Sequence, residues 1–336
     1  MDMIFLTNVY NDIIGDFVKE QYKESKVLSR RFEFKDNVVM LISVYKKSQL
    51  CEVSVAIDDN VTSVFLNSMP KWKGMEERMS ELYDDNNRKR KFLSFKQMVD
   101  FDKKIYFIVM QDIIDTLYES SKNEILNKIK AVLIKWNVFF QFDKDYVLSD
   151  NVQQGLYGEL YLLDKLITLK GEKAVECWTG CNSETHDFYC GIDAVEVKSS
   201  SVKGPNKVNI SSEYQLDDTG VLGRLYLLYL KLKKSEIDGE TLPVIVERIA
   251  SMLSPEYRIK FYDKLLKIGY VYQMPELYKL HFKLREENCY DVEDGFPRIT
   301  AKMLNKGITS VDYTLSLDAC NSFQITIESF YKGVDL

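Results

Sequence analysis

An aspartate, a glutamate and a lysine occur close together in the segment HDFYCGIDAVEVKSS. Side chains of a β-strand alternate between its two faces, so Glu196 and Lys198 should point to one face and the neighbouring valines to the other. Carboxylates are the oxygen ligands that Mg²⁺ prefers, and a lysine beside such an ion can offset charge that builds up on phosphate oxygens. With Asp187 nearby, the segment predicts metal-assisted hydrolysis of a phosphodiester.

A fourth candidate, Glu159, lies in the segment DNVQQGLYGELYLLDKLITLKG, which predicts a helix with Asp150 as its N-cap. Glu159 shares the apolar stripe of this helix, where a carboxylate without a partner would cost several kcal/mol. We therefore expect it to meet a cation, a metal or a water-filled cleft. Gly155 and Gly158 each cost about 1 kcal/mol relative to alanine in a helix interior, which predicts close approach of a neighbouring element.

The spacing of these residues is weak evidence by itself. An aspartate followed at a loose distance by Glu-x-Lys occurs by chance in many charged chains, usually on a solvated strand edge. The order of the expected elements strengthens the hypothesis, because the helix is followed by strand patterns at 186–190, 193–200, 207–216 and 224–234. Helical patterns follow at 242–253 and 255–269, and strand-like patterns at 276–292 and 307–319.

The length of the chain, 336 residues, predicts two domains. Strand-like runs between residues 27 and 65 precede a helical pattern over 112–140, which indicates one helix or a broken pair. The polar segment QFDKDYVLSD then marks the boundary. We expect an α+β region over 1–145 that contacts a partner or DNA, and the domain that carries the chemistry over 146–336.

Composition indicates the cellular compartment of the protein and limits how it could contact nucleic acid. The six cysteines are too dilute for a disulfide framework, which favours a reducing compartment and hence the cytoplasm. We expect no membrane contact and no cleaved signal, because no apolar run is long enough to span a bilayer and the start lacks a basic region. The formal net charge of -6 requires that any nucleic-acid contact use local basic patches.

The motifs GLYGELYLL, W-x7-HDF, AVEVKSS and NISSEYQL, in this order, resemble the PD-(D/E)XK nuclease superfamily. They are similar in particular to an uncharacterised bacterial family of PD-(D/E)XK proteins found in restriction and defence gene clusters. The likeness covers most of the chain beyond residue 100. It implies an α/β fold, α+β overall, with a restriction-endonuclease-like mixed sheet flanked by helices.

The resemblance also implies roles for individual residues. Asp187 takes the position of the motif aspartate, Glu196 that of the second acid and Lys198 that of the lysine. Glu159 takes the acidic position of the preceding helix, and Gln215, expected on the next strand, resembles a glutamine often found near such sites. His186 stands where the motif has proline, a position at which the superfamily often departs.

The activity implied is a metal-dependent DNA endonuclease of a bacterial restriction or phage-defence system. It would use Mg²⁺, for which Mn²⁺ can substitute, held by Asp187 and Glu196. DNA is the expected partner, together with other subunits of a defence complex or a second copy of the chain, because cutting both strands usually needs two active sites. Lys203 and Lys207, in the loop that leaves the catalytic strand, are expected to contact phosphates.

Three alternatives stay open. Cys177, Cys181, His186 and Cys190 could form a zinc-binding module, although structural zinc sites usually have tighter spacing. The basic run NNRKRK, residues 86–91, could contact phosphate, but such runs are more often solvated loops. Finally, the protein could be a catalytically inactive DNA-binding or scaffolding subunit of a defence complex.

Overall fold

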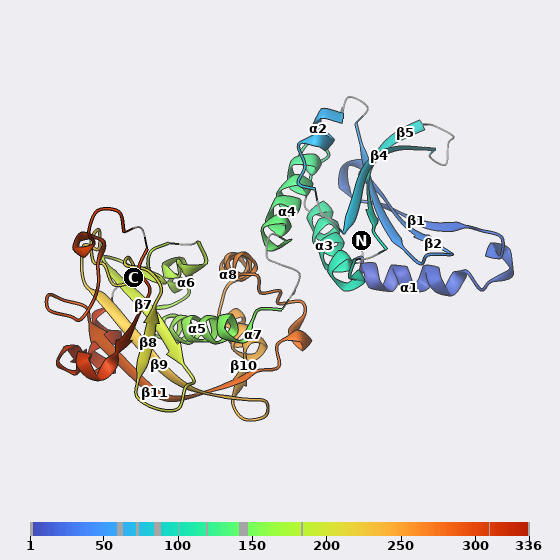
Figure 1. Cartoon of the computed structure of the whole chain (residues 1–336). Coiled ribbons are helices and arrows are strands. Elements are labelled where there is room, and N and C mark those ends of the chain that lie inside the picture. Colours follow the sequence, from blue (N-terminus) through green and yellow to red (C-terminus); the bar gives the residue numbers. More distant parts are fainter. Residues whose placement is uncertain are drawn as a thin grey trace. The chain divides into compact units, whose positions relative to one another are not determined.

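The computed structural model divides into two compact units, Met1–Phe142 and Asp143–Leu336 (Figure 1). The residues it describes are 3–58, 63–71, 74–83, 89–99, 101–118, 120–140, 147–182, 184–308 and 310–334. The division falls close to the polar segment predicted as the boundary. Each unit is considered separately below.

The first unit is built on a five-stranded antiparallel sheet with the strand order β1-β2-β3-β5-β4. The strands are β1 (Val27–Glu33), β2 (Val39–Tyr45), β3 (Cys51–Ile57), β4 (Met75–Tyr83) and β5 (Lys89–Gln97). The helices are α1 (Leu6–Asp16), α2 (Ser63–Asn67), α3 (Lys103–Tyr118) and α4 (Ile125–Phe140), and short 3-10 turns cover Glu20–Tyr22 and Lys35–Asn37.

The helical pattern predicted over 112–140 belongs to two helices, α3 and α4, and α3 begins earlier than predicted. Side chains between them compete for backbone groups and end the first helix. The Ser120 hydroxyl donates to the Thr116 carbonyl, and Glu124 accepts from both the backbone N–H and the hydroxyl of Ser121. Such local hydrogen bonds offer the chain an alternative to a continuous helix.

The second unit contains a mixed sheet with the strand order β10-β11-β9-β7-β6, and β13 pairs with β11. Its strands are β6 (Phe188–Cys190), β7 (Asp193–Ser200), β9 (Leu225–Ser235), β10 (Glu240–Thr241), β11 (His281–Asp291) and β13 (Gln324–Ile325). Strands β7 and β9 are parallel, whereas the other pairs are antiparallel. Strands β8 (Lys207–Ile210) and β12 (Tyr313–Ser316) form a separate antiparallel pair.

The helices of the second unit are α5 (Asp150–Lys170), α6 (Ala174–Cys177), α7 (Leu242–Ser251), α8 (Pro255–Ile268) and α9 (Ile327–Gly333). Short 3-10 turns cover Gly180–Asn182, Pro275–Leu277, Ala301–Met303 and Leu317–Phe323. A sheet with helices packed on it confirms the predicted α/β class. Among the described residues, no helix is both long and apolar enough to cross a membrane.

Two apolar cores lie on the two faces of the central strand β9, which explains its nearly continuous apolar sequence. Tyr226 and Leu228 pack with the leucines of α5 and with α7, while Leu227 and Tyr229 pack on the other side with residues around β8 and β12. The valines of β7 join the α5 core, as strand alternation predicts. The opposite face of β7 carries Glu196 and Lys198.

Helix α5 differs in two details from the prediction. Its N-cap is Ser149, whose hydroxyl accepts from the Val152 N–H, and not Asp150. Of the two glycines, only Gly158 is closely approached, since an added Cβ would lie 3.2 Å from the Ser199 Cβ, whereas a Cβ at Gly155 meets nothing within 4 Å. Gly158 therefore lets β7 pack tightly on α5, and Gly155 does not serve this purpose.

Candidate active site

One cavity of about 400 Å³ brings together the five residues that the sequence predicts to carry the chemistry. Its walls come from the first turns of α5, from β7, from the residue before β6 and from the turn after β8. The lining residues are Asn151, Gln154, Gly155, Glu159, Asp187, Glu196, Val197, Lys198, Ser199 and Gln215.

The backbone around Asp187 fixes this residue at the edge of the sheet. The N–H groups of Thr179 and Gly180 donate to its carbonyl at 2.8 and 2.9 Å. Its carboxylate accepts from the Val197 N–H at 2.8 Å, through Oδ2. The other carboxylate oxygen, Oδ1, is not used in this contact with β7 and lies on the Gly180 side.

Lys198 forms an ion pair inside the cavity. Its Nζ lies 2.9 Å from Oε1 of Glu196, a carboxylate that is only 2% exposed. Nζ also donates to Oε1 of Gln215 at 3.0 Å. An ammonium has three N–H donors. These two acceptors therefore fix the orientation of the ammonium inside the cavity and leave one donor for a bound group.

Gln215 reaches the cavity from a turn and not from a strand, so the prediction of a strand over 207–216 was wrong in its second half. Strand β8 ends at Ile210, and the chain then turns. The side-chain oxygen Oε1 of Gln215 accepts from the Ser211 N–H at 2.9 Å, and this local hydrogen bond closes the turn. The Ser212 hydroxyl also accepts from the Tyr214 N–H at 3.0 Å, and serine side chains compete in this way with strand pairing.

Glu159 is held by a tryptophan that the sequence indicated only as a core residue. The indole N–H of the buried Trp178 donates to Oε2 of Glu159 at 2.7 Å. A Cβ at Gly180 would lie 3.1 Å from the same oxygen and 3.0 Å from Oδ1 of Asp187. The two carboxylates thus lie beside one glycine, where a side chain would crowd both.

The three carboxyl groups that line the cavity, those of Glu159, Asp187 and Glu196, all have raised pKa values. Burial, and then repulsion from Asp187, raises the pKa of Glu159 to about 8. The same two causes, in the same order, raise the pKa of Glu196 well above its ordinary value, and burial raises that of Asp187. One lysine faces three carboxylates, so the cavity has an excess of negative charge when all of them are ionised.

The family model described as "Putative PD-(D/E)XK family member" (DUF4420) matches residues 18–318. The chain belongs to this family. The match begins much nearer the N-terminus than the predicted likeness, so it covers most of both units of the structure. Comparison with the curated proteins and with the solved structures gave no match.

Members of PD-(D/E)XK families are expected to use a divalent metal, and the donor set of the cavity fits one. Mg²⁺ takes oxygen ligands and is usually held by one or two carboxylates, with waters and substrate phosphate completing the octahedron. Asp187 and Glu196 offer such oxygens, and a divalent cation would offset the negative charge of these buried carboxylates. Across the described residues, no three His, Cys, Asp or Glu side chains form a group able to hold a metal by themselves.

The zinc interpretation does not fit the second unit. The residues proposed for it, Cys177, Cys181, His186 and Cys190, do not form such a group in the described chain. The Cys181 thiol donates to the Trp178 carbonyl, and the His186 ring lies 3.9 Å from Glu196. Burial lowers the pKa of His186, so this ring faces the carboxylate as a neutral group.

Reciprocal hydrogen bonds join α5 to β7 at the mouth of the PD-(D/E)XK cavity. The Gln154 amide donates to the Ser199 carbonyl, and the Ser199 hydroxyl donates to the Gln154 carbonyl, each at 3.0 Å. With Asn151 and Gly155, these residues place the positive end of the α5 dipole beside the cavity. Sequence reasoning did not assign them to the site, although the place of Gln154 and Gly155 about one helical turn before Glu159 is a usable signal.

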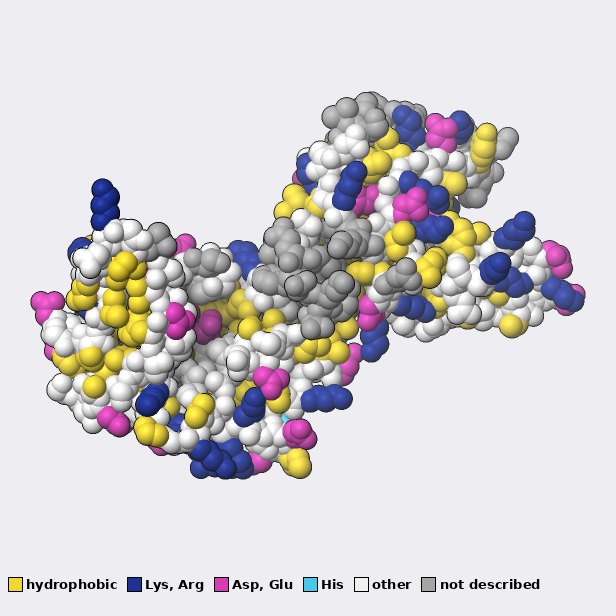
Figure 2. All heavy atoms as spheres, viewed as in Figure 1, with side chains coloured by type: hydrophobic (Ala, Val, Ile, Leu, Met, Phe, Trp, Pro, Cys, Tyr) yellow, Lys and Arg dark blue, Asp and Glu magenta, His cyan; other side chains and the backbone are white. Residues whose placement is uncertain are grey.

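The predicted phosphate contacts lie outside the PD-(D/E)XK cavity. Lys203 is exposed in the loop after β7, and Lys207 is exposed at the start of β8. Of the run NNRKRK, residues 86–88 lie outside the described residues, and Lys89 begins β5. On the face shown in Figure 2, basic and acidic side chains are interspersed over both units.

Proposed function

We propose that the protein is a Mg²⁺-dependent endodeoxyribonuclease of a bacterial restriction or phage-defence system, acting in the cytoplasm. The observation that supports this best is the cavity in which Glu159, Asp187, Glu196 and Lys198 meet, with carboxylates whose pKa values are raised by burial and, for Glu159 and Glu196, also by repulsion from Asp187. A bound divalent ion would polarise the phosphodiester and make a bound water more acidic. Mn²⁺ can take its place.

The side chains of the cavity have distinct roles in this proposal. Asp187 and Glu196 hold the cation, and Asp187 is kept in position by the Val197 N–H. Lys198, oriented by Gln215, directs its remaining N–H toward the phosphate or the attacking water and offsets the charge that develops there. Glu159 lies beside Asp187, next to Gly180, and accepts a hydrogen bond from the Trp178 indole. In this position it would orient a water molecule.

The remaining residues bind the substrate. The positive end of α5 and the exposed Lys203 and Lys207 contact backbone phosphates on either side of the scissile bond. The first unit contacts DNA or another subunit of the defence complex. Cleavage of both strands is achieved by a second copy of the chain, since one cavity acts on one strand.

The test is cleavage of plasmid DNA by the purified protein with Mg²⁺, with Mn²⁺ and with chelator. The wild type should cut only with metal, and Asp187→Ala and Glu196→Ala should each lose activity without a change in far-UV circular dichroism. Each substitution deletes a cation ligand and not an apolar packing group. Equal cleavage by wild type and variants would refute the proposal, and unfolding of both would favour a structural role for the acids.

One observation favours a second candidate, an inactive DNA-binding or scaffolding subunit. Lys198 already neutralises Glu196, which is one of the two expected cation ligands. A site of this kind could keep its ion pair for stability alone. In that case the wild type would bind DNA equally well with and without divalent metal and would show no cleavage on modified or unmodified plasmid.

A further inference from the structure

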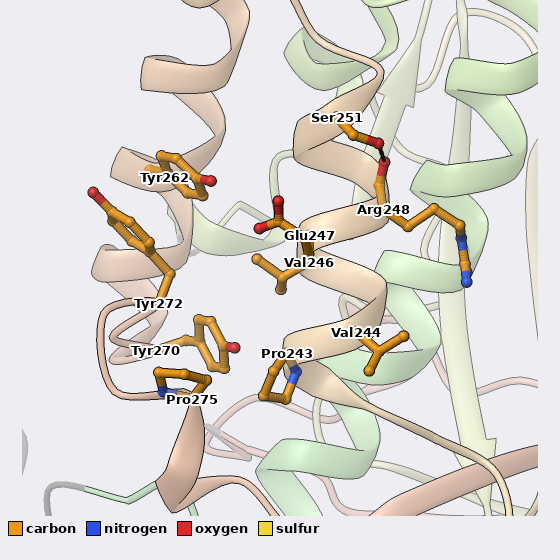
Figure 3. A pocket seen from close by; sticks show the side chains of 10 residues that line it. All are labelled: Pro243, Val244, Val246, Glu247, Arg248, Ser251, Tyr262, Tyr270, Tyr272 and Pro275. Carbon is orange, nitrogen blue, oxygen red and sulfur yellow. Dashed lines mark hydrogen bonds between the residues drawn. The ribbon is translucent and has the colours of Figure 1, made fainter.

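A second cavity of the same unit, about 470 Å³, lies between α7, α8 and the segment that follows α8 (Figure 3). It shares no lining residue with the candidate active site. Its walls are three tyrosines, two prolines, two valines, a glutamate, an arginine and a serine: Tyr262, Tyr270, Tyr272, Pro243, Pro275, Val244, Val246, Glu247, Arg248 and Ser251. Its size is in the range of ligand-binding pockets, which is about 300–1,000 Å³.

The aromatic walls of this cavity, which we name the tyrosine pocket, are held in fixed orientations. The rings of Tyr262 and Tyr272 stack in parallel with centroids 3.8 Å apart and an interplanar angle of 7°. Tyr270 is only 1% exposed and points toward Pro243 at the base of the pocket (Figure 3). Rigid tyrosine rings offer electron-rich faces at a small entropic cost, which favours a cationic ligand.

The charge of the tyrosine pocket comes from Glu247, which points from α7 toward the two stacked rings (Figure 3). Burial, and then this carboxylate, raises the pKa of Tyr262. Among the described residues, Glu247 has no ion pair. Arg248 points away from the pocket and pairs with Asp164 at 3.1 Å, and Arg258 donates to main-chain carbonyls at the end of α7. The pocket therefore combines aromatic faces with an unneutralised carboxylate.

We propose that the tyrosine pocket binds a lysine or arginine side chain of a partner polypeptide. The cationic head meets the Glu247 carboxylate and the face of a tyrosine ring, and the aliphatic stem packs on the apolar wall. A neutral side chain would form no ion pair with the exposed Glu247, and an acidic one would be repelled by it. The inference does not depend on the nuclease activity proposed above.

The shape of the rim is the reason to assign a polypeptide and not a free amine. Small ligands are usually enclosed over most of their surface, but here Val244 is 54% and Tyr272 39% exposed at the edge. Apolar surface beside the carboxylate offers contacts for the residues that flank an inserted side chain. Pro243 and Pro275 extend this apolar surface.

The test uses three fluorescein-labelled heptapeptides that differ only in the central residue, which is lysine, arginine or norleucine, between proline and glycine residues. Binding to the full chain is followed by fluorescence anisotropy, and agmatine serves as a free cation of similar chemistry. A peptide with lysine or arginine should bind about tenfold more tightly than the norleucine peptide, the combined effect expected of an exposed ion pair and a cation–π contact.

Two variants identify the pocket as the site of binding. Glu247→Gln and Tyr272→Leu should each reduce the preference for the cationic peptide, since each removes one of its two causes, while plasmid cleavage stays unchanged. Glu236→Gln, which removes the same charge from an exposed position outside the pocket, is the matched control and should bind as wild type does.

Several results would overturn the proposal. Equal binding of the norleucine and cationic peptides, or an undiminished preference in Glu247→Gln, would exclude the carboxylate as the recognition group. Agmatine binding as tightly as the best peptide would exclude a polypeptide as the source of the cation. Absence of binding by all four probes would refute the site itself.

Discussion

Replacing Glu159 by glutamine should stabilise the metal-free protein, and the gain should grow with pH. The folded-state pKa of Glu159 is about 8, against an ordinary value of 4.5, because of burial and then repulsion from Asp187. Between these values the folded state retains a proton that the unfolded state releases, so the free energy of unfolding falls as pH rises from about 4.5 to 8. Glutamine has the same shape, can still accept from Trp178 and does not titrate.

The magnitude follows from the size of the pKa difference. Each pH unit between the two pKa values corresponds to about 1.4 kcal/mol, which sets an upper bound of roughly 4–5 kcal/mol. Water in the open cavity screens part of this cost, so we expect Glu159→Gln to exceed wild type by about 2 kcal/mol at pH 8.5. At pH 4.5 both side chains are mostly neutral, and the two proteins should be nearly equal.

The assay is urea unfolding in chelator at pH 4.5 and pH 8.5, followed by circular dichroism and by tryptophan fluorescence. Glu236→Gln again serves as the control, because it removes an exposed carboxylate and should not alter the pH dependence relative to wild type. A stability difference between Glu159→Gln and wild type that is zero at pH 8.5, or the same at both pH values, would refute the reasoning.

Three other substitutions give sharp expectations. Trp178→Phe removes the donor to Glu159 and should lower the free energy of unfolding by about 1–3 kcal/mol, and an unchanged unfolding midpoint would contradict this role. Gly158→Ala should destabilise by about 1–3 kcal/mol, since its Cβ would lie 3.2 Å from the Cβ of Ser199. Gly155→Ala, with open space, should stabilise by up to about 1 kcal/mol, and the opposite order in thermal unfolding would invalidate the assignment of the tight contact.

The faces of regular elements were predictable from the sequence because they depend on local periodicity. Strand alternation separates Glu196 and Lys198 from the valines of β7, and helical periodicity places Glu159 with the leucines of α5. Together with the position of Asp187 before a short strand, these periods were enough to bring four side chains to one cavity. The α/β class was what the resemblance to the PD-(D/E)XK superfamily implied.

Features that depend on single hydrogen bonds were not predictable. The turn that carries Gln215 depends on its bond to the Ser211 N–H, and α5 begins one residue earlier than predicted, at an N-cap that Ser149 provides. Trp178 has the composition signal of a core residue, and nothing in the sequence distinguishes its indole bond to Glu159. The tyrosine pocket was not predicted either, because it depends on how α7, α8 and the segment after α8 pack together.

Lys198→Ala is the variant that tests the central claim most directly. Cleavage of plasmid DNA and Mn²⁺ affinity by calorimetry would be measured side by side for wild type, Lys198→Ala and Lys198→Arg. We expect cleavage to fall about 100-fold or more in Lys198→Ala, the size of effect seen when a group that stabilises transition-state charge is removed. Mn²⁺ binding should be intact or slightly tighter, because the cation that pairs with Glu196 at 2.9 Å is gone.

Lys198→Arg should not restore cleavage, because the longer planar guanidinium cannot take the compact position of the ammonium between Glu196 and Gln215. The account thus predicts wild-type cleavage that requires Mn²⁺, and two folded variants that bind Mn²⁺ and do not cut. Full cleavage by Lys198→Ala, or loss of Mn²⁺ binding with an intact fold, would contradict it.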